Sequence, residues 1–316
     1  MLSRVADNLY WMSRYLERAE HTARLVDVHL NLTLDSSVAP EQRWTRVIAS
    51  LGVTAKPPHG TGAPEFLTFD ATGRCSIVSC IAAARENAGQ VREQTSSEMW
   101  QELNRLFHSV RGPDVEKQWI ADPHEFLLQV KARAHLFQGV TDSTMNHDEG
   151  WRFIQLGRFI ERAGALATLL DAHFRAFPAE SETTIGLAEH LEWIGLLRSC
   201  TAFEPYCKVY TADLKPERIA EFLLLNDTFP HSVRFAVDRI QTSAQALPEA
   251  SSRKATTRLT RLTGKLRAAL NFGSIDEIID AGLHPYLDSI RRQCLQIHDA
   301  IREAYIDYPV QIAAGA

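Results

Sequence analysis

Two stretches of the chain, LYWMSRYLERAEHTARLVD at residues 9–27 and FIQLGRFIERAGALATLLD at residues 153–171, repeat each other. At an offset of 144 residues and without a gap, the windows 9–30 and 153–174 share eight identical positions. Chance does not readily produce such agreement, so an internal duplication explains it better. We therefore expect a single domain, 1–316, built from two copies at 1–144 and 145–316.

The apolar residues of both copies recur at alternating spacings of three and four, which is typical of an amphipathic helix. This apolar seam includes Leu16 and Ala19 in the first copy, and Ile160 and Ala163 in the second. Small alanines allow two helices to approach closely. We expect these two helices to pack against each other through the seam, about a pseudo-twofold axis, at the centre of a helical bundle.

The same helical spacing extends over nearly all of the chain and predicts an all-α fold. One short run, Phe66–Phe69, has strand-like character. The proline- and glycine-rich stretch 52–64 is predicted to be a loop, and Pro285 is predicted to kink or break the last helix. The expected helices span 3–35, 40–51, 76–94, 97–110, 123–140, 148–175, 184–200, 215–225, 230–246, 250–271 and 275–306.

Composition narrows the functional classes. A hydrophobic fraction of 45% indicates a globular core, and a formal net charge of -5 argues against general attraction to nucleic acid or to an anionic membrane. No apolar run approaches the roughly 20 residues that span a bilayer. The five cysteines show no Cys-x-x-Cys spacing, which favours a reduced protein. We expect a cytoplasmic protein that does not insert in a membrane.

The Glu-Arg dipeptide at the centre of each copy cannot form an ion pair with itself, because neighbouring helical residues lie about 100° apart. Glu17 has Arg14 three residues before it, and Glu161 has Arg158 in the same position. These charges lie off the apolar seam. The same side of the helix carries aromatic and apolar residues, so we expect the charges to be buried and paired across helices.

Two interpretations of these charges remain open. The favoured one is a structural ion-pair network. The alternative is a cleft between the two copies in which charged residues act as acid–base and anion-holding groups. The candidate catalytic residues are Glu17, Arg18, His21, Glu161 and Arg162.

Other chemical motifs are missing from the sequence. No Glu is followed three residues later by His, which is the spacing of carboxylate-bridged metal sites in helical bundles. There is no phosphate-binding loop of the P-loop or Rossmann type and no nucleophile elbow. We therefore predict no metal and no cofactor, and we expect any nucleotide to be bound by a partner.

One helix carries a basic stripe, which consists of Lys254, Arg258, Arg261 and Lys265. Their spacing places them on one face beside an apolar stripe. This pattern is usual for a solvated helix face. It is also suited to docking an acidic partner or, with less support from the net charge, nucleic-acid phosphates.

Four stretches in order resemble the bacterial alpha-E domain family, an all-helical family with a duplicated Glu-Arg (ER) motif. Besides the ER motifs they are ARENAGQVREQTSSEMWQELNRL at 83–106, DEGWRFIQLGRFIERA at 148–163 and LLLNDTFPHSVRFAVDRI at 223–240. The resemblance covers essentially the whole chain. Beyond the Glu-Arg pairs, the matching motif residues are Arg85, Glu86, Asn87, Asp148 to Trp151 and Asp227, and the resemblance implies binding roles for Arg85, Glu86, Asn87, Asp148 and Asp227. Arg14 and Arg158, which lie beside the Glu-Arg pairs on the same helices, are further candidate binding residues.

The resemblance also implies a functional context. Members of the family occur beside, or fused to, circularly permuted ATP-grasp proteins and transglutaminase-like proteins. It therefore implies an accessory or partner role in an ATP-grasp amide-ligase system that makes or modifies a peptide, with a peptide as the possible substrate. The alternatives are an enzyme in its own right that uses the Glu-Arg cleft, and a structural scaffold that forms homo-oligomers.

Overall fold

The computed structural model describes residues 1–35, 39–73, 75–178, 187–211, 213–250 and 252–307, and every regular element in these ranges is a helix. The prediction of an all-α fold is confirmed. The elements are α1 (Ser3–Asp35), α2 (Pro40–Ser50), α3 (Ala63–Phe69), α4 (Ile77–Gln90), a 3₁₀ turn (Arg92–Gln94), α5 (Ser97–Ser109), α6 (Val115–Ala121), α7 (Pro123–Thr144), α8 (Glu149–Ala176), α9 (Leu187–Ser199), α10 (Phe203–Tyr210), α11 (Pro216–Leu225), α12 (Val233–Gln245), α13 (Arg253–Phe272), α14 (Ile275–Ala281), α15 (Leu283–Ile301) and a π-helical turn (Arg302–Ile306).

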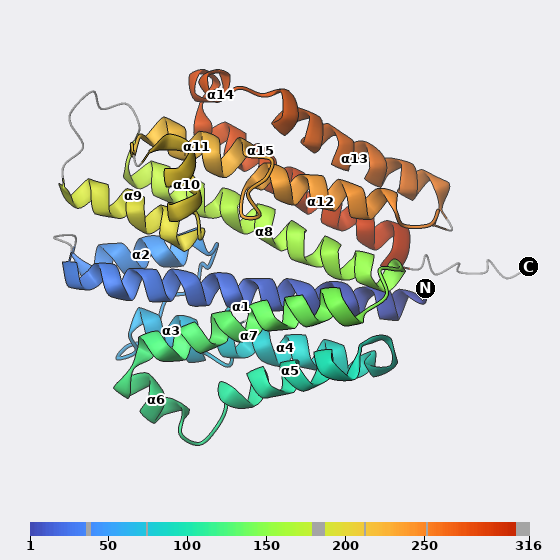
Figure 1. Cartoon of the computed structure of the whole chain (residues 1–316), viewed down its shortest axis with the longest axis horizontal. Coiled ribbons are helices and arrows are strands. Elements are labelled where there is room, and N and C mark those ends of the chain that lie inside the picture. The colour runs from blue at the N-terminus through green and yellow to red at the C-terminus, as the bar shows by residue number, and fades with distance from the viewer. Residues whose placement is uncertain (36–38, 74, 179–186, 212, 251, 308–316) are drawn as a thin grey trace, which may run out of the picture.

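The two helices that carry the ER motifs, α1 and α8, lie side by side in the middle of the molecule (Figure 1). Helix α1 also packs against α4 and α7, and α8 packs against α12 and α15. Helix α5 covers α4 and α7, while α13 covers α12 and α15. Two further helices contact the central helix of the other half of the chain: α2 contacts α8, and α9 contacts α1.

The backbones of α1 and α8 approach each other closely at Gly157. A Cβ atom added there would lie 2.2 Å from the carbonyl oxygen of Tyr10, so only glycine fits. Beside this point the Ser13 hydroxyl donates to the carbonyl of Ile154 at 2.7 Å. The absence of a side chain at Gly157 therefore sets how tightly the central pair can pack.

Helix α1 meets α8 partly through polar side chains. Tyr10, Ser13 and Glu17 lie on one side of α1. At 3.6 residues per turn, the apolar seam lies on a different side of the same helix. The seam is fully buried, with Leu16 at 3% and Ala19 at 1% exposure. The prediction that the two ER helices pack against each other is confirmed, and the polar contacts between them come from residues that lie off the seam.

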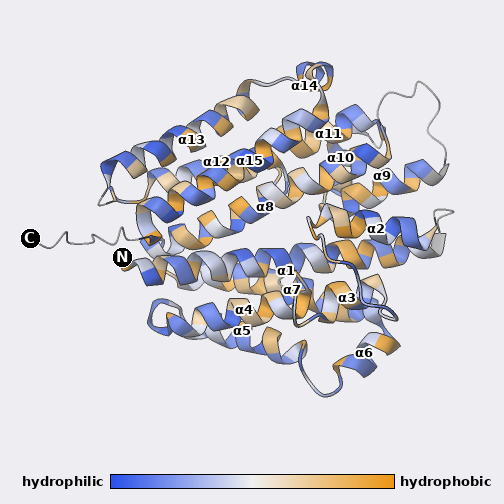
Figure 2. Ribbon diagram, turned by 180° about the vertical axis from the view of Figure 1, so that it is seen from behind, coloured by the Kyte–Doolittle hydropathy of each residue, from blue (hydrophilic) through white to orange (hydrophobic). Residues whose placement is uncertain are grey.

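Apolar residues are distributed through most of the helices, with hydrophilic residues prominent on the outer ones (Figure 2). Large side chains such as Trp193, Tyr206 and Phe153 are buried almost completely. None of the described helices is both long and apolar enough to cross a bilayer.

The run Phe66–Phe69 forms part of α3, so the strand-like assignment is wrong. Phe66, Leu67 and Thr68 are all buried. In so short a buried run, the sequence pattern of a helix cannot be distinguished from that of a strand. Pro64 lies in the first turn of α3, where a missing amide hydrogen costs nothing. The predicted loop 52–64 therefore ends at Gly62, one residue before the helix begins.

The last predicted helix is broken at Gly282 and not at Pro285. Gly282 has a φ of +99°, and α15 begins directly after it. Pro285 lies in the first turn of α15, where proline is tolerated. The short helices α6 and α10 were not predicted, and residues 184–186 of the helix expected at 184–200 lie outside the described residues.

Candidate functional site

The ER motifs pair across α1 and α8. Glu17 receives two hydrogen bonds from Arg162, from Nε at 2.5 Å and from Nη2 at 3.0 Å. Arg158 Nε lies 3.7 Å from the same carboxylate, and Gln138 of α7 donates to it at 3.3 Å. We call Glu17, Arg162, Arg158 and Gln138 the Glu17 cluster.

The second glutamate has the reciprocal arrangement. Glu161 accepts from Arg14 Nε at 2.8 Å and from Arg18 Nε at 2.6 Å. We call Glu161, Arg14 and Arg18 the Glu161 cluster. Each glutamate is thus paired with the two arginines of the other helix, so the expected pairing across helices is present in both copies.

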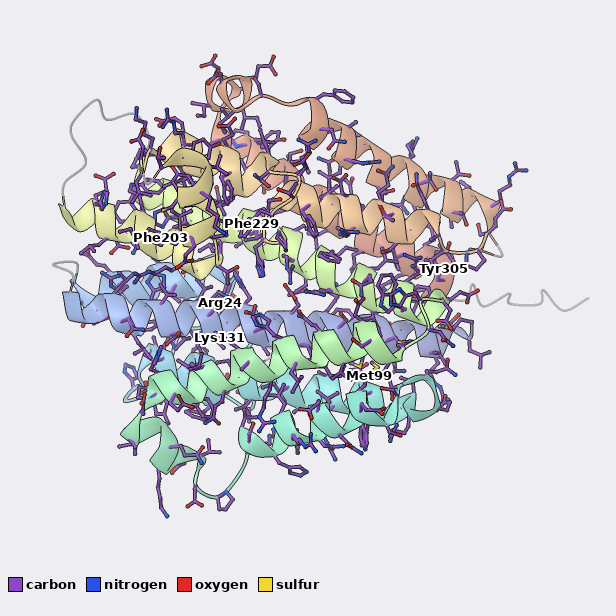
Figure 3. The ribbon with its side chains drawn as sticks, viewed as in Figure 1. Arg24, Met99, Lys131, Phe203, Phe229 and Tyr305 are labelled. Carbon is purple, nitrogen blue, oxygen red and sulfur yellow. The ribbon has the colours of Figure 1, made fainter. Side chains whose placement is uncertain are left out.

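The centre of the Glu17 cluster is buried, whereas the Arg158 side chain at its edge is 24% exposed. The side chains of Glu17 and Arg162 are 3% and 4% exposed. Arg162 Nη1 also donates to the carbonyl of Pro230 at 2.9 Å, which fixes the loop before α12 over this side. Arg24, which is marked in Figure 3 on the adjoining part of α1, is also largely buried.

The Glu161 cluster lines a pocket of about 350 Å³. Helices α1, α8 and α15 contribute most of its wall, together with residues of the segments that precede α3 and α4. Its described lining residues are Arg14, Arg18, His21, Leu51, Gly52, Cys75, Ile160, Glu161, Gly164, Ala165, Thr168, Arg291, Cys294, Leu295 and His298. The two ER copies therefore differ, because the Glu161 cluster borders this pocket and none of the pocket's described lining residues belongs to the Glu17 cluster.

Electrostatics keep both glutamates ionised. Burial raises the pKa of Glu161, but Arg14 and Arg18 outweigh it and hold the pKa at about 2. Burial likewise opposes the ionised form of Glu17, and Arg162 followed by Arg158 lowers its pKa below the usual value. Neither carboxylate can exchange a proton readily near neutral pH.

The two histidines of the pocket are neutral. Burial lowers the pKa of His21 to about 4 despite the opposing charge of Glu17 and Glu161. Burial, followed by the charge of Arg14, lowers the pKa of His298 to about 4. The buried Nε2 atom of His21 has no hydrogen-bond partner among the described residues.

The tautomer of His298 follows from its neighbours. Its Nδ1 atom lies 2.8 Å from the Tyr10 hydroxyl and 3.3 Å from Arg14 Nη1. Arg14 can only donate, so Nδ1 must accept and the proton of the neutral ring must be on Nε2. His298 therefore carries a donor on the ring atom opposite Tyr10 and Arg14.

The remaining predicted binding residues do not join either cluster. Arg85 of α4 donates to Asn104 of α5 at 2.6 Å and lies over the ring of Phe107. Glu86 is exposed, and Asn87 donates to a carbonyl within α4. These three residues belong to the α4–α5 surface.

Of the other two predicted binding residues, Asp148 precedes α8 and Asp227 lies in the loop between α11 and α12. The Asp148 carboxylate accepts from the amide of Gly150 and so caps the N-terminus of α8. Asp227 is exposed and lies 3.7 Å from Arg234. Neither residue borders the pocket beside Glu161.

The basic stripe lies on α13. Lys254, Arg261 and Lys265 are exposed, whereas Arg258 pairs with Glu303. One of the four predicted cations is thus partly neutralised, and the other three face solvent.

Sequence reasoning missed the contribution of α15. His298, Arg291 and Leu295 line the pocket, yet they belong to no repeat and to no recognised motif. The spacing of Tyr10 and Arg14 could have indicated that these two side chains meet, but nothing in the sequence identifies His298 as their third member.

No group of three or more His, Cys, Asp or Glu side chains among the described residues is placed to hold a metal ion. Residues 1–306 match the model of the Alpha-E family, described as a predicted alpha-helical domain with a conserved ER motif. The chain belongs to the alpha-E family. In this alpha-E chain, both central helices carry a Glu-Arg dipeptide.

The curated relatives of this alpha-E protein are mycobacterial. The chain is 24% identical over 331 aligned residues to an uncharacterized protein of Mycobacterium bovis, and equally so to one of Mycobacterium tuberculosis. The alignment covers 95% of the alpha-E chain but 36% of each relative. The chain therefore spans about a third of the length of these relatives. No solved structure matches it.

Proposed function

We propose that this alpha-E protein is an accessory, ligand-binding component of an ATP-grasp amide-ligase system that makes or modifies a peptide. In this proposal the partner binds ATP and forms the amide bond, and the alpha-E chain holds a peptide or its precursor. The single observation that carries a binding role is the charge state of the pocket.

The groups that line the pocket are poorly suited to proton transfer. Efficient general acid–base catalysis needs a pKa near the working pH. The pKa of Glu161 is about 2, and those of His21 and His298 are about 4. Burial raises the pKa of the Cys294 thiol to about 12. Fixed charges and neutral donors are suited to holding a polar ligand in place.

The context of the family supports a partner. The curated relatives extend far beyond the matching region, as expected of a domain that works with further polypeptide. The resemblance to proteins found beside ATP-grasp and transglutaminase-like proteins points to amide-bond chemistry for that polypeptide. Any self-association of the alpha-E chain would be additional to this role.

We also propose that the molecule consists of two pseudo-symmetric halves, 1–144 and 145–316, that arose by duplication. Matching contacts support this. The Ser76 hydroxyl caps α4 and donates to the carbonyl of Asp70, and the Ser232 hydroxyl caps α12 and donates to the carbonyl of Asn226. The two copies have also diverged, because Ala165 occupies the position in the second copy that His21 occupies in the first. Such divergence allows the surroundings of the two glutamates to take on different roles.

Co-purification tests the proposed function. A tagged alpha-E chain is expressed with the ATP-grasp protein encoded nearest to its gene, and ATP turnover is measured with and without the chain. We expect a stable complex and a change in turnover when a peptide substrate is added. Absence of a complex together with unchanged turnover would refute the accessory role.

A further inference from the structure

The pocket beside the Glu161 cluster has an excess of positive charge. Arg14, Arg18 and Arg291 line it, and Glu161 is the acid among its described lining residues. Glu161 already accepts from two of these arginines, so it neutralises one of the three cations. Asp288 lies 4.0 Å from Arg291, which leaves that pair weakly coupled at the rim.

Polar groups in the pocket wall also suit an anion. His298 has its Nε2 proton on the side of the ring away from Tyr10 and Arg14. His21 also lines the pocket, with its Nε2 atom turned into the protein interior. A guanidinium such as that of Arg14 matches the geometry of a carboxylate and binds it well.

The remainder of the wall is apolar and leaves room for a ligand body. Leu51, Ile160 and Leu295 contribute hydrophobic surface. A Cβ atom added at Gly164 would have no neighbour within 4 Å, so the centre of α8 presents open space here. A volume of about 350 Å³ lies near the lower end of the range for small-molecule sites.

We propose that this pocket binds the carboxylate of a small acyl or peptidyl ligand, with Arg14 and His298 at the carboxylate and the side chain of the ligand against Ile160 and Leu295. The choice of a carboxylate over other small anions rests on the proposed function, because amide ligases act on carboxylates. The site itself rests on the geometry of the pocket.

The first experiment compares matched probes on the purified chain without a partner. N-acetyl-L-leucine carries a carboxylate, N-acetyl-L-leucinamide has the same body without the charge, and inorganic phosphate is an anion without the body. Calorimetric titration should show binding of the acid at least about tenfold tighter than binding of either comparison probe, which corresponds to about 1.4 kcal/mol. Equal affinity for the acid and the amide would overturn the proposal. Tighter binding of phosphate than of the acid would also overturn it, because the pocket would then be a phosphate site and not a carboxylate site.

The second experiment fills the pocket. Gly164→Leu places a side chain in the open space and should weaken binding of N-acetyl-L-leucine at least about tenfold. Gly139→Leu is the matched control, because Gly139 is an exposed helical glycine of α7 that also has no neighbour within 4 Å. Unchanged affinity in Gly164→Leu would overturn the site. If that variant does not fold, the comparison of acid with amide on the unaltered chain still decides.

Failure of this assignment can be distinguished from failure of the accessory role. The probe titrations need no partner, and the co-purification needs no ligand. A chain that binds the acid but captures no ATP-grasp protein refutes the proposed function alone. If the unaltered chain and Gly164→Leu both capture the partner normally but neither binds the acid, the assignment of a ligand to the pocket is refuted and the accessory role is not.

Discussion

Replacing Arg162 with methionine should be the most damaging single change in either cluster. It removes the cation that donates twice to Glu17, whose side chain is 3% exposed, and it leaves the Pro230 carbonyl without its donor. Breaking a buried ion pair costs about 3–5 kcal/mol. Pro230 is exposed, so water can replace the donor that its carbonyl loses. Because Arg158 remains 3.7 Å from Glu17 and offsets part of the ion-pair cost, we expect a loss of about 3 kcal/mol.

Urea unfolding followed by far-UV circular dichroism measures this loss, provided that the denaturant slope is unchanged. Arg258→Met is the control, because Arg258 and Glu303 form an exposed pair that should contribute less than about 1 kcal/mol. Arg18→Met should fall between the two, since Arg14 still pairs with Glu161 and the pocket admits water. The reasoning is refuted if Arg162→Met costs no more than Arg258→Met.

Three further predictions concern other parts of the molecule. Gly157→Ala should destabilise the chain by at least about 1–3 kcal/mol, because its methyl group meets the backbone of Tyr10; an unchanged unfolding midpoint would contradict this. Burial lowers the pKa of His29 from 6.5 to about 3. The unfolded chain therefore takes up this proton first, and stability should fall as the pH drops below about 6.5, by up to about 1.4 kcal/mol per pH unit. His29→Gln should show a shallower fall in urea unfolding, and an identical pH profile would count against it. Lys254→Glu combined with Arg258→Glu should weaken partner capture most at low salt; capture that is unaffected at low salt would exclude the α13 surface.

The repeated ER stretch predicted the central part of the fold well. A duplicated amphipathic pattern identified α1 and α8, and charges lying off an apolar seam indicated ion pairs between helices. The sequence could not show which face of α1 meets α8. Apolar periodicity marks a buried face, but in a helix covered all round by neighbours it does not say which neighbour lies there. Gly157, where the backbones touch, could be recognised as decisive only once its contact with Tyr10 was known.

The sequence predicted which residues form the candidate site, but not that the two Glu-Arg clusters have different surroundings. The equivalent motifs predicted ion pairs across helices in both copies, whereas only their positions in the fold show that the Glu17–Arg162 pair is buried and that the Glu161 cluster lies beside a pocket. The difference arises from neighbours far away in the sequence, namely Gln138 and Pro230 over Glu17, and α15 beside Glu161. Contacts of that kind depend on how loops and outer helices pack, which local patterns do not encode.

The central claim is that the Glu161 cluster binds a ligand while the Glu17 cluster holds the fold together. Nuclear magnetic resonance of the arginine Nε–Hε groups, during titration with N-acetyl-L-leucine, tests it most directly. The signals of Arg14 and Arg18 should shift as the acid is added, and the signal of Arg162 should stay in place. Shifts of equal size at Arg14 and Arg162, or no shift at any of them, would contradict the claim.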